Sequence, residues 1–192
     1  LQQRIEASTD DEDRNELKMM FRNAERLNLL TNQILELSRI ESGSSKLQVS
    51  YCNITSVLNI AYSYFHAKAA DGNIDYKLML PQNSIMGWID AEKVEHILFN
   101  LLSNAFKFTP CGGTISLKAY PHATQVVIEV SDTGIGIPPD KLPLIFDRFY
   151  QVNDCGSCTN GSGIGLTLSK ELADLHLGVL EASSMQGQGS KF

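Results

Sequence analysis

The chain has 192 residues, 43% of them hydrophobic, which is enough for one domain of ordinary size with its own core and an appendage. Its formal net charge of -6 provides no basic stripe, so neither nucleic acid nor an anionic membrane surface is expected as a partner. The sequence has no apolar run near the roughly 18 residues of a membrane span and no signal-peptide pattern, so we expect a soluble, cytoplasmic piece, whose parent protein could still be anchored in a membrane.

The four cysteines do not form a recognisable framework. Cys52 and Cys111 are isolated, and only Cys155 and Cys158 lie close together, in the sequence CGSC. This spacing indicates neither a disulfide framework nor a four-ligand zinc site, so we expect reduced thiols. A single Cys-x-x-Cys in a polar loop is more often a chance occurrence than a redox motif, and the role of this pair stays open.

Residues 9–40 predict one long helix. Thr9 and Glu12 are spaced as a capping box, and aspartates fill the first turn. Apolar residues repeat every seven positions and others widen the same stripe: Met20, Leu27 and Ile34, with Leu17, Ala24, Leu30 and Leu37. Since one helix cannot bury its own stripe, we expect a partner helix from another chain or from preceding sequence. The alternative is packing on the domain that follows.

The composition changes at the Gly-Ser-Ser sequence of residues 43–45, and we place a domain boundary there, between residues 1–45 and 46–192. The second region predicts strands and compact helices in alternation. The expected elements are a strand at 46–51, a helix at 54–70, strands at 75–80 and 88–89, a helix at 91–108, a hairpin of strands 114–120 and 126–132, a short hydrophobic helix within 141–151, a helix at 166–177, a strand at 179–182, and a turn that enters a last strand near Phe192.

Helix 91–108 carries an unusual polar edge, after a good N-cap at Asp90. Five polar residues lie within about 80° of arc beside its core stripe: Lys93, His96, Asn100, Asn104 and Lys107. Asparagine is a poor helix former, so two of them four residues apart suggest ligand contact, with surface decoration as the alternative. An asparagine carbonyl can complete the coordination of a Mg²⁺ held mainly by phosphates and water, and a lysine can neutralise phosphate oxygens.

Strand 126–132 ends at Asp132 and leads directly into a glycine loop. Gly134 and Gly136 lack a Cβ, so a flat ligand or a phosphate could approach the backbone closely there. Asp132 could then accept a hydrogen bond from an exocyclic amine such as that of adenine, whereas guanine presents an acceptor at that position. In isolation the pattern also fits a surface turn, and Asp-Thr-Gly matches aspartic proteases, which need two such loops.

Residues 152–160 are polar and rich in turn formers, and they predict a lid. Gly161, Gly163 and Gly165 then lead into the next helix, whose free N-terminal amides favour anions. Dinucleotide-binding folds also use a glycine triplet, but there it follows a strand, whereas this one follows a loop.

Five motifs, in this order, resemble the sequence boxes of the sensor histidine kinase catalytic domain: NLLSNAFKFTP, DTGIGIPP, IFDRFYQ, NGSGIGLTLSKEL and QGQGSKF. The match covers nearly everything from Lys46 onward. The preceding LTNQILELSRIESG looks like the second helix of the kinase dimerisation hairpin. The resemblance implies a Bergerat-type α/β fold, an α+β sandwich in which a mixed sheet is covered by helices on one face. It also implies ATP and Mg²⁺ as ligands, held between sheet, helices and lid.

The resemblance assigns roles residue by residue. It implies catalytic positions at Asn100, Asn104 and Lys107, with Asn104 on Mg²⁺, Lys107 on the phosphates, and Asp132 on the adenine amine. Further nucleotide-contacting positions are Phe108, Gly134, Gly136, Ile137, Phe149, Gly161, Ser162, Gly163, Ile164, Gly165 and Leu166, and Phe146 joins Phe149 in an aromatic box beneath the lid. Where Asn100 stands, hydrolysing relatives such as DNA gyrase carry a glutamate base. An amide cannot take a proton from water, so the site suits phosphoryl transfer better than hydrolysis.

The implied function is an ATP-dependent protein-histidine kinase of bacterial two-component systems. Its γ-phosphate would pass to a histidine on a dimerisation domain of the same or a partner chain, and then to a response regulator receiver domain. The implied parent is a homodimeric inner-membrane sensor. The rival reading is a degenerate kinase-like module that binds nucleotide and signals by conformation alone.

Two departures from the family pattern matter. No phosphoacceptor box occurs, and none of the four histidines lies on a helix seam beside an acidic residue: His66, His96, His122 and His176. We therefore expect a fragment without the acceptor, in which His66 serves packing. The second departure is Leu177, which stands where a second glycine is usual and should alter a turn.

Overall fold

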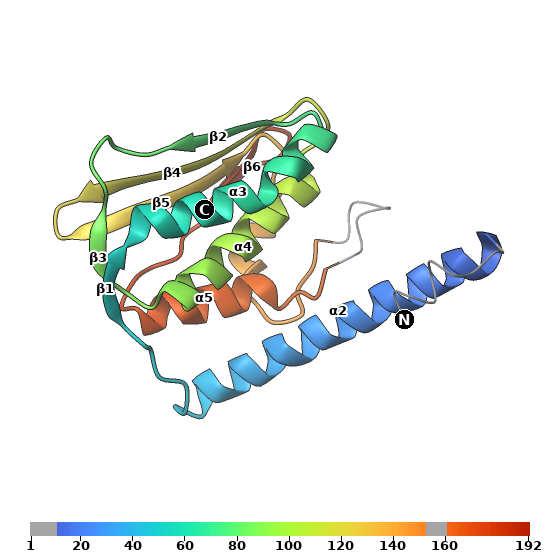
Figure 1. Ribbon diagram of the computed structural model, residues 1–192, viewed down its shortest axis with the longest axis horizontal. Coiled ribbons are helices and arrows are strands. Elements are labelled where there is room, and N and C mark those ends of the chain that lie inside the picture. The colour runs from blue at the N-terminus through green and yellow to red at the C-terminus, as the bar shows by residue number, and fades with distance from the viewer. Residues whose placement is uncertain (1–10, 153–160) are drawn as a thin grey trace. The chain divides into compact units, whose positions relative to one another are not determined.

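The computed structural model describes residues 11–152 and 161–192 (Figure 1). The chain divides into two units, residues 1–45 and residues 46–192, each held together by its own contacts. The predicted capping residue Thr9, residues 153–160 of the lid predicted at 152–160, and the Cys155 and Cys158 pair lie outside the described residues. Across the described ranges, no helix is both long and apolar enough to cross a bilayer.

The first unit contains helix α2 (Asp11–Glu41), which confirms the predicted long helix over this range. Three members of its seven-residue repeat are exposed: Met20, Leu27 and Ile34. The helix ends just before Gly43, which adopts a φ of +66°, and the N–H of Ser44 donates to the carbonyl of Arg39 at 3.0 Å. A left-handed glycine is a common way to close a helix, so the predicted break is a defined turn.

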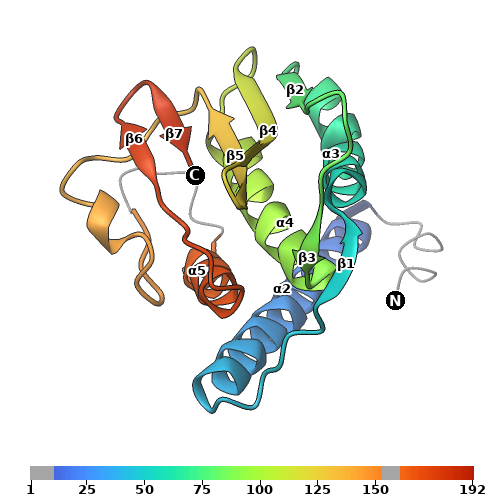
Figure 2. The same cartoon turned by 90° about the vertical axis from the view of Figure 1, so that its left-hand side faces the viewer.

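The second unit is built on a mixed sheet with strand order β2-β4-β5-β7-β6 among the described residues (Figure 2). The strands are β2 (Asp75–Met79), β4 (Thr114–His122), β5 (Gln125–Asp132), β6 (Ser183–Met185) and β7 (Gly189–Lys191). β2 pairs with β4 in parallel and the other pairs are antiparallel. β1 (Ser50–Asn53) and β3 (Met86–Ile89) form a separate antiparallel ribbon. The predicted mixed sheet is confirmed.

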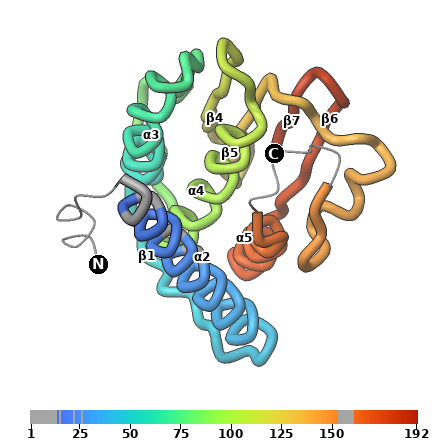
Figure 3. The backbone as a smooth tube through the Cα atoms, turned by 90° about the vertical axis from the view of Figure 1, so that its right-hand side faces the viewer, coloured from blue at the N-terminus to red at the C-terminus, as the bar shows by residue number. Residues whose placement is uncertain are grey.

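Three helices cover one face of the sheet: α3 (Ile54–Asp71), α4 (Ala91–Phe108) and α5 (Gly165–Leu175) (Figure 2). Burial alternates along β4, as expected for a sheet with one covered face. Ile115, Leu117 and Ala119 are buried, whereas Ser116 and Lys118 on the opposite face are only half-buried. α4 lies between α3 and α5 and contacts both (Figure 3). Burial of a leucine such as Leu58, Leu98 or Leu102 contributes about 1.5–3 kcal/mol each to this core.

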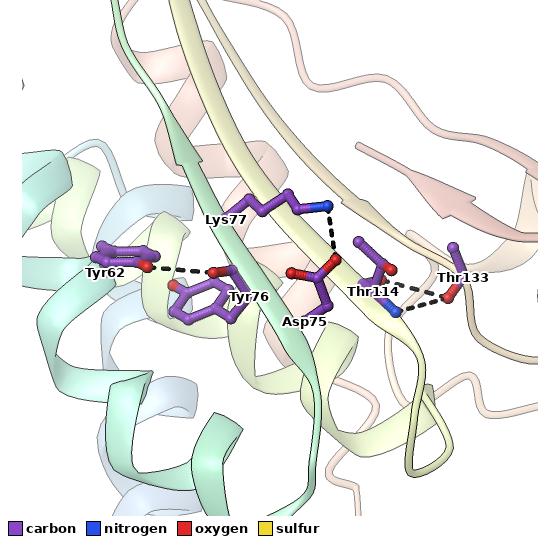
Figure 4. Close-up of polar contacts among 6 residues, drawn as sticks. All are labelled: Tyr62, Asp75, Tyr76, Lys77, Thr114 and Thr133. Carbon is purple, nitrogen blue, oxygen red and sulfur yellow. Dashed lines mark hydrogen bonds and ion pairs between the residues drawn. The ribbon is translucent and has the colours of Figure 1, made fainter.

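Two tyrosines tie β2 to α3 (Figure 4). The rings of Tyr62 and Tyr76 stack with their centroids 4.4 Å apart, and the Tyr62 hydroxyl donates to the Tyr76 carbonyl at 3.2 Å. On the same strand Lys77 and Asp75 form an ion pair of 2.6 Å, but both side chains are exposed, so it contributes little to stability.

Several sequence-based expectations for short elements are wrong. The strand expected at 46–51 forms at Ser50–Asn53, and the strand expected at 179–182 forms instead at Ser183–Met185. The hydrophobic helix expected within 141–151 is reduced to a single 3-10 turn at Leu142–Leu144. Asp132 was expected at the edge of an antiparallel pair, but β7 lies next to β5, so Asp132 ends a strand that is paired on both sides. Of the misplaced short elements, only β1 depends on a distant partner, β3, whereas β6 pairs with the neighbouring β7 and the 3-10 turn contains Pro143.

The C-terminus of α5 contains a leucine in a conformation that suits glycine. The N–H of Gly178 donates to the carbonyl of Ala173 at 2.9 Å, and the N–H of Leu177 donates to that of Asp174 at 2.9 Å. This is the Schellman arrangement, in which the residue after the cap takes left-handed backbone angles. Leu177 has a φ of +57° and is 91% exposed, so its side chain gains no packing to offset the strain.

Replacing Leu177 with glycine should therefore stabilise the protein by about 0.5–1 kcal/mol, because relief of left-handed strain exceeds the extra entropy of an unfolded glycine. Chemical denaturation of the ligand-free protein measures this change. Leu177→Ala is the matched control, since it removes the exposed side chain but keeps the Cβ. Equal stability of the glycine and alanine variants would contradict a backbone origin.

Candidate functional site

α4 is the element that places the predicted polar edge, and its bounds agree with those expected from the sequence. At its start the Asp90 carboxylate accepts from the N–H of Lys93 at 3.2 Å and from the N–H of Gln48 at 2.8 Å. At its end the N–H of Thr109 donates to the carbonyl of Ala105 at 3.0 Å. The Asp90 cap and the bond from Thr109 thus define where the helix begins and ends.

Asn100 joins α4 to α5. Its Nδ2 donates to the Oγ of Ser169 at 2.8 Å, and Ser169 is buried. A Cβ on Gly165 would overlap the Oδ1 of Asn100, so a larger residue at the start of α5 would force the Asn100 side chain to move. The sequence predicted Asn100 on a ligand-binding edge but missed Ser169, for which no signal exists beyond a polar residue on the buried side of an amphipathic helix.

Asn104 and Lys107 follow on the same edge of α4. Asn104 is half-buried, and its side chain has no hydrogen bond to other residues in the described ranges. The Nζ of Lys107 lies 4.7 Å from the ring centroid of Phe108 and would be 3.4 Å from a Cβ on Gly161. The last turn of α4 therefore meets the start of the second glycine loop.

Asp132 ends β5 as a half-buried carboxyl. Burial raises its pKa above the ordinary aspartate value, and hydrogen bonds from the backbone N–H groups of Gly134 and Ser190 oppose this by lowering it. The bond from Gly134 to Oδ1 is 2.7 Å long. The next residue, Thr133, is held to β4 by a hydrogen bond of 2.9 Å from the Thr114 N–H to its Oγ1 (Figure 4). The carboxyl is thus fixed in orientation.

The first glycine loop packs its backbone against two other segments. A Cβ on Gly134 would lie 2.5 Å from the carbonyl oxygen of Phe108, and the N–H of Ile135 donates to that same oxygen at 3.2 Å. Gly136 has a φ of +66°, and a Cβ there would overlap the carbonyl of Met185. These glycines were expected to admit a ligand, and the structure shows that they also admit neighbouring backbone.

The continuation of this loop reaches β6. The N–H of Ile137 donates to the Oγ of Ser184 at 2.8 Å. The same hydroxyl donates to the carbonyl of Gly189 at 2.8 Å and lies 2.9 Å from the Oγ of Ser190. Ser184 was not singled out by its sequence, although it holds the loop after Asp132 to the last two strands.

The second glycine loop contacts the aromatic segment 146–149. The N–H of Phe149 donates to the carbonyl of Gly163 at 2.8 Å, and a Cβ on Gly163 would lie 2.6 Å from the Phe149 carbonyl carbon. Phe149 itself is 66% exposed. The Oγ1 of Thr167 donates to the carbonyl of Phe146 at 2.8 Å. Segment 146–149 is therefore held to the glycine loop and to α5 through its backbone, while the Phe149 ring remains mostly exposed.

The remaining predicted positions are closer to the core. Ile164 is buried and its N–H donates to the Oγ of Ser162 at 3.2 Å, while Leu166 is partly buried against the hydrophobic core. In the described part of the chain no group of three histidine, cysteine or acidic residues could hold a metal ion. A bound Mg²⁺ would therefore depend on an amide oxygen such as that of Asn104, completed by ligand oxygens and water.

Comparison with known proteins agrees with this geometry. Residues 89–192 match the family model described as histidine kinase-, DNA gyrase B-, and HSP90-like ATPase. The hybrid signal transduction histidine kinase D of Dictyostelium discoideum is 36% identical over 187 residues, which are 93% of this chain and 12% of that protein. The chain thus spans a small part of that relative.

Solved structures that are similar over 96% of the chain include ShkA and ThkA. Full-length ShkA in complex with AMPPNP has a TM-score of 0.81 at 26% identity, and the match covers 38% of its chain. Histidine kinase ThkA in complex with the response regulator TrrA has a TM-score of 0.75 at 20% identity, with 51% of its chain covered. At 20% identity, the likeness to ThkA shows a similar fold and nothing further.

Proposed function

We propose that this chain, which belongs to the family of histidine kinase-, DNA gyrase B-, and HSP90-like ATPases, binds Mg-ATP and delivers the γ-phosphoryl group to a histidine on a dimerisation domain. One observation carries the proposal. The last turn of α4 meets both glycine loops, through the Phe108 carbonyl at Ile135 and through the Lys107 ammonium beside Gly161. A base-recognising carboxyl and a phosphate-binding loop are thereby joined by one helix.

Asp132 would recognise the base. Its carboxylate can accept a hydrogen bond from the adenine amine, and a guanine oxygen at that place would leave the half-buried carboxylate unsatisfied at a cost of about 1–3 kcal/mol. The ShkA structure supports an adenine nucleotide, since that protein was solved with AMPPNP. Gly136 and Ile137 would border the base on the loop that Ser184 secures.

The phosphates would lie between α4 and the second glycine loop. Mg²⁺ would neutralise charge on the phosphoryl oxygens, and Asn104 would supply a protein ligand to it. The Lys107 ammonium would contact the same phosphates, together with backbone N–H groups at the start of α5. Gly161 suits such a cradle because a Cβ there would lie 3.4 Å from the Lys107 ammonium, whereas Gly163 and Gly165 let the loop pack on Phe149 and Asn100.

Within the described residues of the site, an amide stands where a base for hydrolysis is expected. Asn100 occupies the position where hydrolysing relatives carry glutamate, and its amide is engaged by Ser169. Phosphoryl transfer depends chiefly on positioning and charge neutralisation, so an incoming imidazole can act as nucleophile without a base on this chain. This favours transfer to histidine over transfer to water.

The parent protein would be a homodimeric sensor kinase that is anchored in the inner membrane. α2 would be one helix of its dimerisation hairpin, with the exposed repeat of Met20, Leu27 and Ile34 facing partner helices. A response regulator receiver domain would then take the phosphoryl group. The ThkA structure supports a response regulator as partner, because that protein was solved in complex with the response regulator TrrA.

Asn104→Ala tests the metal assignment. Alanine is the better helix former and should raise the free energy of unfolding slightly, by up to about 0.7 kcal/mol, whereas loss of a metal ligand should weaken the Mg²⁺ dependence of ATP binding. Calorimetric titration of ATP with and without Mg²⁺ gives the binding change, and denaturation gives the stability. Ser103→Ala, exposed on the same helix, is the control. An unchanged Mg²⁺ response in Asn104→Ala would remove Asn104 from the metal site.

A further inference from the structure

His176 bridges the two helices of the proposed nucleotide site at the end remote from the glycine loops. It is the C-cap residue of α5. Its Nδ1 lies 2.7 Å from the carbonyl oxygen of Leu172, and its Nε2 accepts a hydrogen bond of 3.2 Å from the N–H of Asp90. Asp90 immediately precedes α4 and is itself buried. One imidazole thus joins the last turn of α5 to the start of α4.

These contacts define the state of the ring. The Leu172 carbonyl can only accept, so Nδ1 must carry a proton, and the Asp90 N–H can only donate, so Nε2 must carry a lone pair. The bridge therefore requires neutral imidazole protonated on Nδ1. The Asp90 carboxylate meanwhile holds the N–H of Gln48 and the N–H of Lys93. The junction binds three segments of the chain at one point.

α4 and α5 have a second attachment at Asn100 and Ser169. At 1.5 Å per residue, Asn100 lies about 15 Å along α4 from Asp90, and Lys107 lies about 10 Å further on. Core packing holds the apolar stripe of α4, and these two attachments hold its polar edge against α5. If Asp90 moved by about 1 Å and α4 turned as a rigid body about Asn100, Lys107 would move by roughly 0.7 Å in the opposite direction.

We propose that His176 is a positioning residue of the phosphoryl-transfer site, which acts through the Asp90 backbone to fix the direction of α4 and so the place of Asn104 and Lys107. This inference rests on the proposed function. A misplacement of about 1 Å can cost up to about 100-fold in a reaction that depends on orientation. The transfer rate should therefore respond more strongly than nucleotide affinity.

Two substitutions separate the contacts of the ring. His176→Asn can keep a donor for the Leu172 carbonyl but is too short to reach the Asp90 N–H, whereas His176→Gln can place an amide oxygen near the position of Nε2. His66→Asn is the control, because His66 is exposed on α3 and only lies edge-on to Tyr62 at 6.1 Å between centroids. All variants are measured in the whole chain.

The experiment combines calorimetry with ATP, the rate of transfer to a histidine-bearing dimerisation hairpin added in trans, and imidazole nitrogen NMR of the unsubstituted chain. We expect His176→Asn to lose about 10- to 100-fold in rate and at most about tenfold in affinity, with recovery in His176→Gln and no change in His66→Asn. The NMR spectrum should show His176 protonated on Nδ1 alone.

Three results would overturn the inference while leaving the proposed function intact. They are an unchanged transfer rate in His176→Asn, an equal loss in His176→Gln and His176→Asn, and an Nε2-protonated ring in the unsubstituted chain. The NMR result decides even where a variant fails to fold. An unsubstituted chain that binds no ATP would instead contradict the proposed function itself.

Discussion

Replacing Asp132 with asparagine should weaken ATP binding by about 1.5–3 kcal/mol, which is roughly 10- to 150-fold in the dissociation constant. The shape of the side chain is retained, but its hydrogen-bonding pattern is not. The N–H of Gly134 requires an oxygen at 2.7 Å, so the amide oxygen should take that position and the new NH₂ group the other. A donor would then face the adenine amine, which is also a donor.

Calorimetric titration of ATP and GTP against both proteins measures this effect. Asp140→Asn is the matched control, since Asp140 is an exposed aspartate in the turn that follows the same loop. We expect the control to bind ATP as the unsubstituted chain does and neither protein to bind GTP. Undiminished ATP affinity in Asp132→Asn, or comparable binding of GTP by the unsubstituted chain, would disprove the assignment of Asp132 to the base.

The same carboxyl should give stability and binding opposite responses to pH. Because burial raises the pKa of Asp132 in the folded state, the neutral form favours folding, and that contribution is lost as the pH rises through the folded-state pKa. ATP binding requires the ionised form, so affinity should fall as the pH is lowered through the same pKa. At neutral pH, Asp132→Asn should therefore leave the unfolding free energy of the ligand-free protein unchanged or higher while affinity falls.

The sequence predicted α4 with its correct bounds because the signals that define it are local. Asp90 caps the first turn, the apolar stripe repeats at helical spacing, and Pro110 stops the last turn. The same periodicity placed Asn100 and Asn104 on one edge. It could not distinguish them, because Asn100 is set apart by Ser169, which lies 69 residues away in the chain.

Short strands were predicted less well, because pairing and not local preference decides where they form. Val179 suggested a strand but is 78% exposed, and the pairing begins four residues later, where Ser184 meets Gly189 and Ser190. Similarly, Pro143 lies inside the segment predicted as a hydrophobic helix, and only a 3-10 turn forms. A pattern of apolar residues indicates burial there, but not the backbone conformation that achieves it.

The glycines of the first loop were predicted to leave room for a ligand, and in the structure they leave room for neighbouring protein atoms. Gly134 was predicted to let a ligand approach, yet the nearest atoms to its missing Cβ belong to the Phe108 backbone and the Asp132 side chain. The absence of a Cβ is visible in a sequence, but the neighbour that needs the space is not. His66, predicted to serve packing, is exposed.

Incubated with γ-labelled ATP and Mg²⁺, this chain should bind nucleotide and remain unlabelled, and label should appear only on a dimerisation hairpin that carries a phosphoacceptor histidine. We expect label on the hairpin and none on the chain, because the chain's own histidines are poorly suited as acceptors. Both ring nitrogens of His176 are engaged, and His122 lies at the end of β4. His96 is on α4 itself, and His66 is on α3.

The transfer experiment also separates an active kinase from a module that binds nucleotide and signals by conformation. The hairpin is supplied covalently or in trans, and its control is the same hairpin with the phosphoacceptor histidine replaced by glutamine. Label on the histidine-bearing hairpin and not on the glutamine variant supports transfer, whereas ATP binding without label on either hairpin supports the conformational module. An acid-labile, alkali-stable label on the chain alone would show that one of its four histidines accepts phosphate, because phosphohistidine has that stability, and the assignment of this chain as a donor without an acceptor would then be wrong.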